Sequence, residues 1–159
     1  MAIACNPVGW VTSSRIEPLD DNWESVTASI RLAPDQFSED ALAGLSGFSH
    51  IEVVYVFDRV DPVDVPTGAR HPRDNRDWPK VGIFAQRGKA RPNRLGVTAC
   101  RLLAVDGLEL SVQALDAIDG TPVLDIKPYM TEFGPRGPVH QAQWAHELMA
   151  GYWAAGPER

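Results

Sequence analysis

Apolar and polar positions alternate along much of the chain, and this pattern predicts strands. In residues 26–32 every second side chain is apolar, as expected for a strand with one buried face. Residues 51–57 are mainly β-branched or aromatic, which favours a buried strand. Shorter apolar stretches predict further strands at residues 8–12, 81–85, 96–105 and 108–115.

Turn and helix signals separate these strands. Asp106-Gly107 is a tight-turn sequence, so the strands on either side of it should pair as a hairpin. Residues 38–44 are typical of a short capped helix with a glycine at its end, and residues 61–78 form a loop rich in proline and arginine. Apolar side chains recur at helical spacing over residues 142–153, which predicts an amphipathic helix that packs on the domain.

Length and composition are those of one globular domain. The chain has 159 residues and no apolar run long enough to span a membrane. Cys5 and Cys100 are too few for a disulfide framework or a four-ligand zinc site, so we expect reduced thiols. The first residues lack the basic start and apolar core of a signal peptide, which favours a cytoplasmic location. We therefore predict a mainly β single domain with short helices and a C-terminal amphipathic helix.

Charge is distributed unevenly along the chain. Residues 70–94 hold eight arginines and lysines against two aspartates, a net charge of +6 in a chain whose total is −6. Such a basic stretch in an acidic protein suits an anionic ligand bound at one place. The alternative is a solvated loop whose arginines pair with nearby acids, as charge runs usually do.

Several common chemistries are not indicated by the sequence. No G-x-G-x-x-G motif is present, which argues against a Rossmann-type nucleotide site. Residues 82–89 miss the P-loop spacing by one residue, and Ala90 stands where its metal-binding Ser or Thr belongs. The four histidines show no metal-ligand spacing, so we expect no metal site.

Two segments concentrate polar chemistry. Residues 81–98 run from a strand into a basic loop and back into a strand, and Arg87 lies just past the first strand end. A guanidinium there could hold a carboxylate through two parallel hydrogen bonds. Residues 115–129 place three aspartates, a lysine and a tyrosine around a Gly-Thr-Pro turn. A structural alternative for this segment is a turn held by Asx-type hydrogen bonds beside an Asp125–Lys127 ion pair.

Both segments resemble the signature motifs of the TsaA-like, or TrmO-type, family. Residues 82–96 match the family pattern G-[IV]-F-A-x-R-x-x-x-R-P-N-x-[IL]-G, and residues 119–129 match D-G-T-P-[VL]-[VL]-D-I-K-P-Y. Residues 47–51 resemble a third family segment, and the similarity extends from about Pro7 to Tyr129. The family includes the methyltransferase of N6-threonylcarbamoyladenosine beside the tRNA anticodon.

The resemblance implies a fold, a cofactor and its contacts. It predicts a β-barrel domain over residues 1–135 with a helical extension at 136–159, and a homodimer with S-adenosylmethionine near the subunit interface. Arg87 matches the cofactor-contacting arginine of the family, and Val97 matches an apolar residue that lines the cofactor. The other implied contacts are an adenosine-facing stretch and the place of a common His-Gln pair at a strand end: Ala114, Leu115, Asp116, Asp58 and Arg59.

The implied reaction needs alignment more than covalent catalysis, because the sulfonium methyl is already activated. The N6 nitrogen of adenine is a poor nucleophile, so a carboxylate could accept its proton as the methyl arrives. Asp119 is the candidate base. Arg91 and Arg94 would hold RNA phosphates or the threonyl carboxylate, and three further residues would orient the substrate: Lys127, Tyr129 and Asn93.

Two departures from the family pattern leave the acceptor open. Residues 19–23 replace an early P-R-Q-P-G-type loop, and the chain ends soon after the barrel segment, where many bacterial relatives have a further domain. Methylation of tRNA is the first hypothesis, with methylation of a small metabolite and a non-catalytic cofactor sensor as alternatives. Salt-sensitive tRNA binding would separate the first two, and cofactor binding without turnover would indicate the third.

Overall fold

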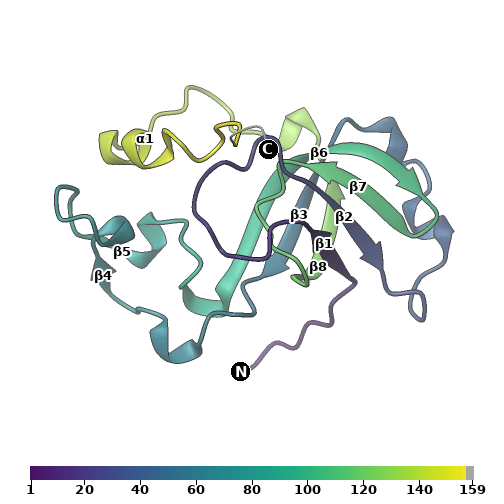
Figure 1. The fold of residues 1–159 in the computed structure, drawn as a ribbon, viewed down its shortest axis with the longest axis horizontal. Coiled ribbons are helices and arrows are strands. Elements are labelled where there is room, and N and C mark those ends of the chain that lie inside the picture. Colours follow the sequence, from purple (N-terminus) through teal and green to yellow (C-terminus); the bar gives the residue numbers. More distant parts are fainter. Residues whose placement is uncertain (157–159) are drawn as a thin grey trace.

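Six antiparallel strands close into a barrel, on the right in Figure 1. The computed structural model describes residues 1–156. Around the barrel the strand order is β1-β2-β7-β6-β3-β8. The strand bounds are β1 Gly9–Ser13, β2 Thr27–Leu32, β3 His50–Val56, β6 Leu95–Asp106, β7 Glu109–Gln113 and β8 Pro122–Pro128.

The barrel strands other than β8 lie where the apolar pattern predicts them. Strand β3 shows why, because Ile51, Val53 and Tyr55 are each at most 1% exposed while the side chains between them are half-buried. The β6–β7 hairpin forms as expected, and Gly107 adopts φ +57° in its turn, a conformation that favours glycine. The predicted mainly β barrel is therefore confirmed.

The strand expected over residues 81–85 is wrong beyond its second residue. Only Val81–Gly82 forms a strand, β5, which pairs with the two-residue strand β4 at Ala69–Arg70. The next three residues, Ile83–Ala85, turn away as a 3-10 helix that buries Ile83. The apolar sequence of residues 81–85 therefore reflects the burial of one side chain, Ile83, and not a continuous β-strand.

Two further elements differ from the sequence expectation. The helix expected near residue 38 is a single 3-10 turn, Glu39–Leu42, and the Ser38 side chain makes no cap hydrogen bond. Strand β8 has no counterpart in the predicted pattern, since proline stands at each of its ends, Pro122 and Pro128, and charged residues interrupt its apolar run. Its inner face is nevertheless apolar, because Val123 is fully buried.

Apolar side chains from all six strands fill the barrel. Cys100 lies among them with 1% exposure, whereas Cys5, near the N-terminus, is exposed. The buried strand residues are Val11, Ile30, Leu32, Ile51, Val53, Tyr55, Cys100, Leu110, Val112 and Val123. This continuous core accounts for the stability of the barrel body.

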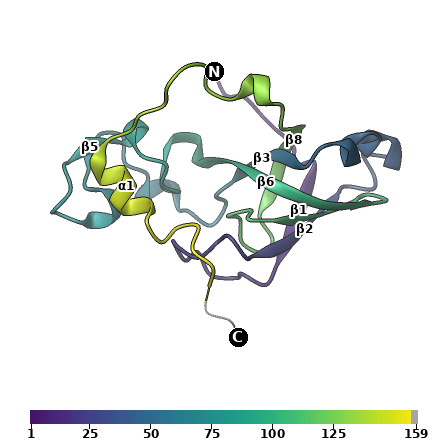
Figure 2. The same cartoon turned by 90° about the horizontal axis from the view of Figure 1, so that it is seen from above.

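Two irregular parts lie beside the barrel. Residues 57–94, called the side lobe below, contain β4, β5 and short 3-10 turns on the left of Figure 1. Residues 141–156, the C-terminal segment, carry helix α1 (Gln143–Met149) against this lobe, as Figures 1 and 2 show. Helix α1 is shorter than predicted, and residues 157–159 of the expected extension lie outside the described residues. Within residues 1–156, none of the helices is long and apolar enough to cross a membrane.

Candidate functional site

One carboxylate, that of Asp116, joins the barrel to the C-terminal segment. Its Oδ1 accepts a hydrogen bond from the Tyr55 hydroxyl at 2.9 Å and another from the Thr98 hydroxyl. Its Oδ2 accepts a hydrogen bond from the Tyr152 hydroxyl. These four residues, the Asp116 network below, come from the loop after β7, from β3, from β6 and from the C-terminal segment. Three donors fix the orientation of the carboxylate.

The backbone around this network explains its geometry. Ala114 adopts φ +62°, a left-handed conformation that is strained for a residue with a Cβ and that turns the chain sharply out of β7. Leu115 then enters the core without any exposed surface, which fixes the position of Asp116 next to it. Gly96 pairs with Tyr55 across the β3–β6 ladder, and a Cβ at this glycine would lie 2.5 Å from the tyrosine ring. A glycine here makes room for the ring whose hydroxyl reaches the carboxylate.

Burial and the nearby carboxylate keep these hydroxyls protonated. Burial, and then the charge of Asp116, raises the pKa of Tyr55 far above that of a free phenol. The same two causes raise the pKa of Tyr152, and the positive charge of Arg87 opposes this rise. Burial also raises the pKa of the Cys100 thiol to about 12. Both tyrosines therefore serve as hydrogen-bond donors and not as bases at neutral pH.

Arg87 lies at the rim of the Asp116 network. Its guanidinium donates to the backbone carbonyl of Val97 at 2.9 Å, one residue before Thr98. Both Arg87 and Val97 are exposed, so a ligand could reach them. The structure thus brings together, at one end of β6, the following predicted cofactor residues: Arg87, Val97, Ala114, Leu115 and Asp116.

The basic loop of the side lobe carries charge that is largely uncompensated. Arg91 and Arg94 donate to backbone carbonyls within the lobe at 2.8 and 2.7 Å, which shapes the loop but leaves their charge unpaired. Arg73 forms an ion pair with Asp21 at 2.8 Å. As far as the structure describes the chain, no carboxylate lies within 4.0 Å of the other basic groups of residues 70–94. This part of the surface is therefore suited to an anion.

The candidate base, Asp119, holds two loops together. Its Oδ1 accepts the backbone N–H of Ser13 at 3.0 Å, and the Arg59 guanidinium donates to its backbone carbonyl at 3.1 Å. Its Oδ2 has no hydrogen-bond partner within residues 1–156. The side chain thus bonds to the end of β1 and, as far as the chain is described, makes no Asx-type hydrogen bond within its own turn, and one of its oxygens is still available for a proton.

Lys127 and Tyr129 lie away from the Asp116 network. The backbone N–H of Tyr129 donates to His50 at the start of β3, and Lys127 is paired with Glu52 in the ladder. The network meets β3 at Tyr55, three to five residues further along. At a rise of about 3.3 Å per residue, this places the two groups roughly 10–16 Å apart along the strand.

Like Lys127, the predicted positions Asp58 and Asn93 lack contact with the network in the described structure. Lys127 forms an exposed ion pair with Asp125 at 2.5 Å, as in the structural alternative. Asp58 is exposed just past β3. Asn93 is exposed at the tip of the basic loop with φ +62°, a conformation that asparagine tolerates better than most residues.

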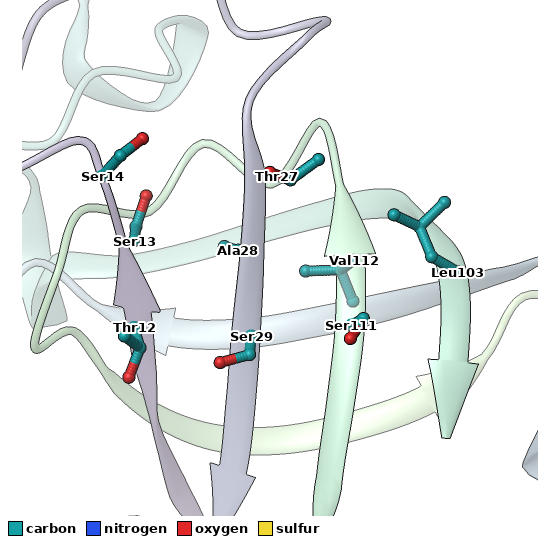
Figure 3. A pocket seen from close by; sticks show the side chains of 9 residues that line it. All are labelled: Thr12, Ser13, Ser14, Thr27, Ala28, Ser29, Leu103, Ser111 and Val112. Atoms are coloured by element: carbon teal, nitrogen blue, oxygen red, sulfur yellow. The ribbon is translucent and has the colours of Figure 1, made fainter. Parts of the chain in front are cut away.

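A shallow depression of about 440 Å³ lies on the outer face of the barrel, as Figure 3 shows. Small and hydroxyl side chains line it, among them Thr12, Ser29 and Ser111 on three neighbouring strands. The predicted site residues do not contribute to it. Over the described residues, no group of three or more His, Cys, Asp and Glu side chains is placed to hold a metal ion.

Comparison with known proteins decides the family. Residues 16–134 match the model of the tRNA-methyltransferase O N-terminal domain, which covers most of the chain. The chain belongs to the TrmO family. A crystal structure of TrmO superposes with a TM-score of 0.72 at 26% identity, over 89% of this chain and 64% of that one.

TrmO relatives differ widely in how much of their length this chain covers. The tRNA (adenine(37)-N6)-methyltransferase of Escherichia coli is 33% identical over 131 residues, which are 80% of this chain and 55% of that protein. The mouse protein of the same name is 39% identical over 95 residues, but the match is 22% of its length. A protein of Methanothermobacter thermautotrophicus named "Probable S-adenosyl-L-methionine-binding protein" is 38% identical over 144 residues, 86% of this chain and 97% of that one.

The sequence analysis names Asp116 as a TrmO-type cofactor residue, and this stays a prediction, but it does not name the hydroxyls that bond to Asp116 in the structure. Thr98 carried a usable signal, since it is a polar side chain at an inward-facing position of β6. Tyr55 was hidden in an apolar strand, where its ring contributes to the core. Tyr152 lay within an apolar helical pattern and beyond the range 16–134 that matches the family model.

Proposed function

We propose that this protein is an S-adenosylmethionine-dependent methyltransferase that methylates N6 of threonylcarbamoyladenosine beside the tRNA anticodon. The observation that carries the proposal is the convergence of Arg87, Val97 and residues 114–116 at one end of β6, next to an uncompensated basic loop. The name of the Escherichia coli relative supports the same reaction at N6 of adenine 37.

The residues at this end of the barrel fit the proposed cofactor. Asp116 Oδ2 has acceptor capacity beyond its bond from Tyr152, so it can take a ribose hydroxyl or an adenine amino group. Val97 offers apolar surface, being 44% exposed. The Arg87 guanidinium can pair with the carboxylate of the methionine part. When bound, S-adenosylmethionine supplies an activated methyl group.

The chain's own residues would then align the acceptor and remove one proton. S-adenosylmethionine would supply the methyl carbon and keep the sulfur as its leaving group, and N6 of the acceptor would have to give up its hydrogen. Asp119 Oδ2 is the proposed acceptor of this proton, because Oδ1 is occupied by Ser13 and fixes the side chain. Arg91, Arg94 and Asn93 would orient the RNA from the basic loop.

A homodimer in the cytoplasm completes the proposal. Phe84 and Leu95 are exposed apolar side chains close in the chain to Arg87 and Val97, as expected for a surface that a second copy covers. A second copy could also supply Lys127 and Tyr129, which lie apart from the Asp116 network within one chain. Light scattering should give twice the 17.4 kDa chain mass, and a 17 kDa species at micromolar concentration would contradict the dimer.

Methylation of a small molecule is the second candidate. Asp20 and Asp21 lie 3.8 and 2.8 Å from Arg73 and add negative charge beside the basic loop. With a total charge of −6, the chain binds a polyanion less readily than a basic protein would.

The deciding experiment incubates the protein with labelled S-adenosylmethionine and tRNA that carries unmethylated threonylcarbamoyladenosine, followed by nucleoside mass spectrometry. Methyl label in that nucleoside supports the proposal. Label in a metabolite extract but not in tRNA supports the second candidate, and cofactor binding without any transfer indicates a sensor.

Asp119→Asn should lower the single-turnover rate about 100-fold or more at unchanged cofactor affinity. A fully active variant would contradict the role of Asp119 as a base and would mean that methyl transfer needs only correct positioning of the reactants.

A tRNA-binding titration at several salt concentrations tests the basic loop. Arg91→Ala and Arg94→Ala should weaken tRNA binding, and each lost phosphate contact should reduce the slope of log K against log salt concentration by about 0.9 or slightly less. An unchanged salt slope in both variants would remove these arginines from the RNA surface.

A further inference from the structure

Besides the Tyr152–Asp116 hydrogen bond, two further hydrogen-bonded contacts attach the C-terminal segment. The Trp78 indole N–H of the side lobe donates to the Glu147 carboxylate of α1 at 2.8 Å. Further on, the backbone N–H of Trp23 donates to the carbonyl of Tyr152 at 2.9 Å. The segment therefore spans from the side lobe to the loop after β1, and Figures 1 and 2 both show this path.

The loop that receives the segment is itself well ordered. The Arg15 guanidinium lies 4.0 Å from the centre of the Trp23 ring and donates to the Asp21 carbonyl at 2.9 Å. The Asp21 side chain pairs with Arg73 of the side lobe. These contacts involve the loop after β1, beside Trp23, whose backbone receives the segment. The loop and the segment therefore form one docked unit.

Docking brings one functional group of the segment to the Asp116 network. The Tyr152 hydroxyl donates to Asp116 Oδ2, while Tyr55 and Thr98 donate to Oδ1. Tyr152 is half-buried, and the charge of Arg87 acts on its hydroxyl. Tyr152 is therefore the network member that the C-terminal segment supplies, and its hydroxyl bonds directly to Asp116, a predicted cofactor residue.

We propose that Tyr152 is a positioning residue of the cofactor site and that docking of the C-terminal segment completes this site. Tyr55 and Thr98 hold only one oxygen of Asp116, so the Tyr152 hydroxyl is what holds Oδ2. With Oδ2 fixed, its remaining acceptor capacity points in one direction, toward the hydroxyl or amino group of the adenosine part. This inference rests on the proposed function, because it names a residue of the same site.

The test measures affinity for S-adenosylmethionine by calorimetry at 15 °C, where all variants should be folded. Tyr152→Phe keeps the ring and removes only the hydroxyl, and it should raise Kd about tenfold, the effect of losing one hydrogen bond to a charged group. Trp78→Phe loosens the segment without touching Asp116 and should raise Kd about two- to threefold. Arg31→Gln removes the exposed Arg31–Glu109 ion pair between barrel strands β2 and β7 and serves as the control, with unchanged Kd.

A double-mutant cycle tests whether Tyr152 acts through Asp116. Asp116→Asn should lower affinity by itself, and adding Tyr152→Phe to it should have little further effect. A purely structural tyrosine would instead lower the melting temperature and leave Kd at 15 °C unchanged. Additive losses, or a Kd in Tyr152→Phe or Trp78→Phe equal to that of the unmodified protein, would overturn the inference and leave the proposed function intact. An unmodified protein that does not bind S-adenosylmethionine would overturn both.

Discussion

The barrel and the side lobe are held together in different ways. In the barrel, backbone ladders and a continuous apolar core define the structure, and most polar side chains face outward. In the side lobe, side chains bond to backbone carbonyls: His71 to Trp78 at 2.8 Å, and Gln86 to Arg70 and Val81 at 3.1 and 3.0 Å. The barrel is thus stabilised by burial and the lobe by individual polar contacts.

This difference separates stability from function along the chain. The barrel supplies rigid strand ends, and the lobe adds the charge and the strained backbone positions where ligands would bind. Four residues of the lobe other than glycine have positive φ: Arg73, Asp74, Asn93 and Arg94. Such conformations persist where surrounding contacts over-determine them, and they cluster at functional sites. Substitutions in the barrel should therefore change the free energy of unfolding, and substitutions in the side lobe should change ligand affinity.

The largest expected effect is on the stability of the barrel. Leu110→Ala removes a fully buried side chain from the core, and it should lower the free energy of unfolding by about 2–5 kcal/mol. Urea unfolding measures this loss. Affinity of the folded protein for S-adenosylmethionine, measured at low temperature, should stay the same. A marked loss of affinity without a loss of stability would contradict the view that the barrel determines stability and the side lobe determines binding.

The next effect is on binding. Arg87→Ala removes an exposed side chain whose contact in the chain is the Val97 carbonyl, so the free energy of unfolding should change by no more than about 1 kcal/mol. Affinity for S-adenosylmethionine should fall by about 1.5–3 kcal/mol, because a charge-assisted contact is lost. Calorimetric titration decides it, with Arg31→Gln, an exposed arginine of barrel strand β2, as the matched surface control. Equal affinities in the two variants would remove Arg87 from the site.

The last effect is absent at neutral pH and appears only under alkaline conditions. The pKa of Cys100, and those of Tyr55 and Tyr152, are raised by burial in the folded state, so the unfolded chain ionises first as the pH rises. The stability due to the protonated groups is complete below about pH 9 and is lost above it, by about 1.4 kcal/mol per pH unit for each ionising group. Urea midpoints from pH 8 to 11 should fall accordingly. The fall should be shallower in Tyr152→Phe, and midpoints that stay constant to pH 11 would contradict the prediction.

Sequence periodicity predicted the barrel because burial there repeats every two residues. In β3 the inward residues are Ile51, Val53 and Tyr55, and any residue shift would expose all of them. The sequence pattern did not predict strand β8, because the strand begins and ends with proline. It is nevertheless paired on both sides, with β1 and with β3. Residues 83–85 show the opposite error. They were predicted to continue a strand because they are apolar, but they have no partner strand and form a 3-10 turn instead.

The candidate site was less predictable because its contacts are made between distant side chains. Asp116 and Arg87 followed from the family resemblance, and the structure places them near the same tyrosine. Tyr152 lies 36 residues from Asp116, and no spacing rule links two such positions. The strained φ of Ala114 was equally invisible, since alanine is common in ordinary strand ends and nothing in its sequence neighbourhood indicates a left-handed turn.

The difference in exposure between Cys5 and Cys100 allows barrel opening to be measured by thiol labelling. A thiol reagent in excess should label Cys5 at once, because it is exposed, and should reach Cys100 only when the barrel opens. The unaltered chain therefore carries both a handle for a probe near its N-terminus and a reporter of global opening. Because S-adenosylmethionine would stabilise the closed barrel, the second labelling phase should slow as cofactor is added, giving an affinity without any substitution.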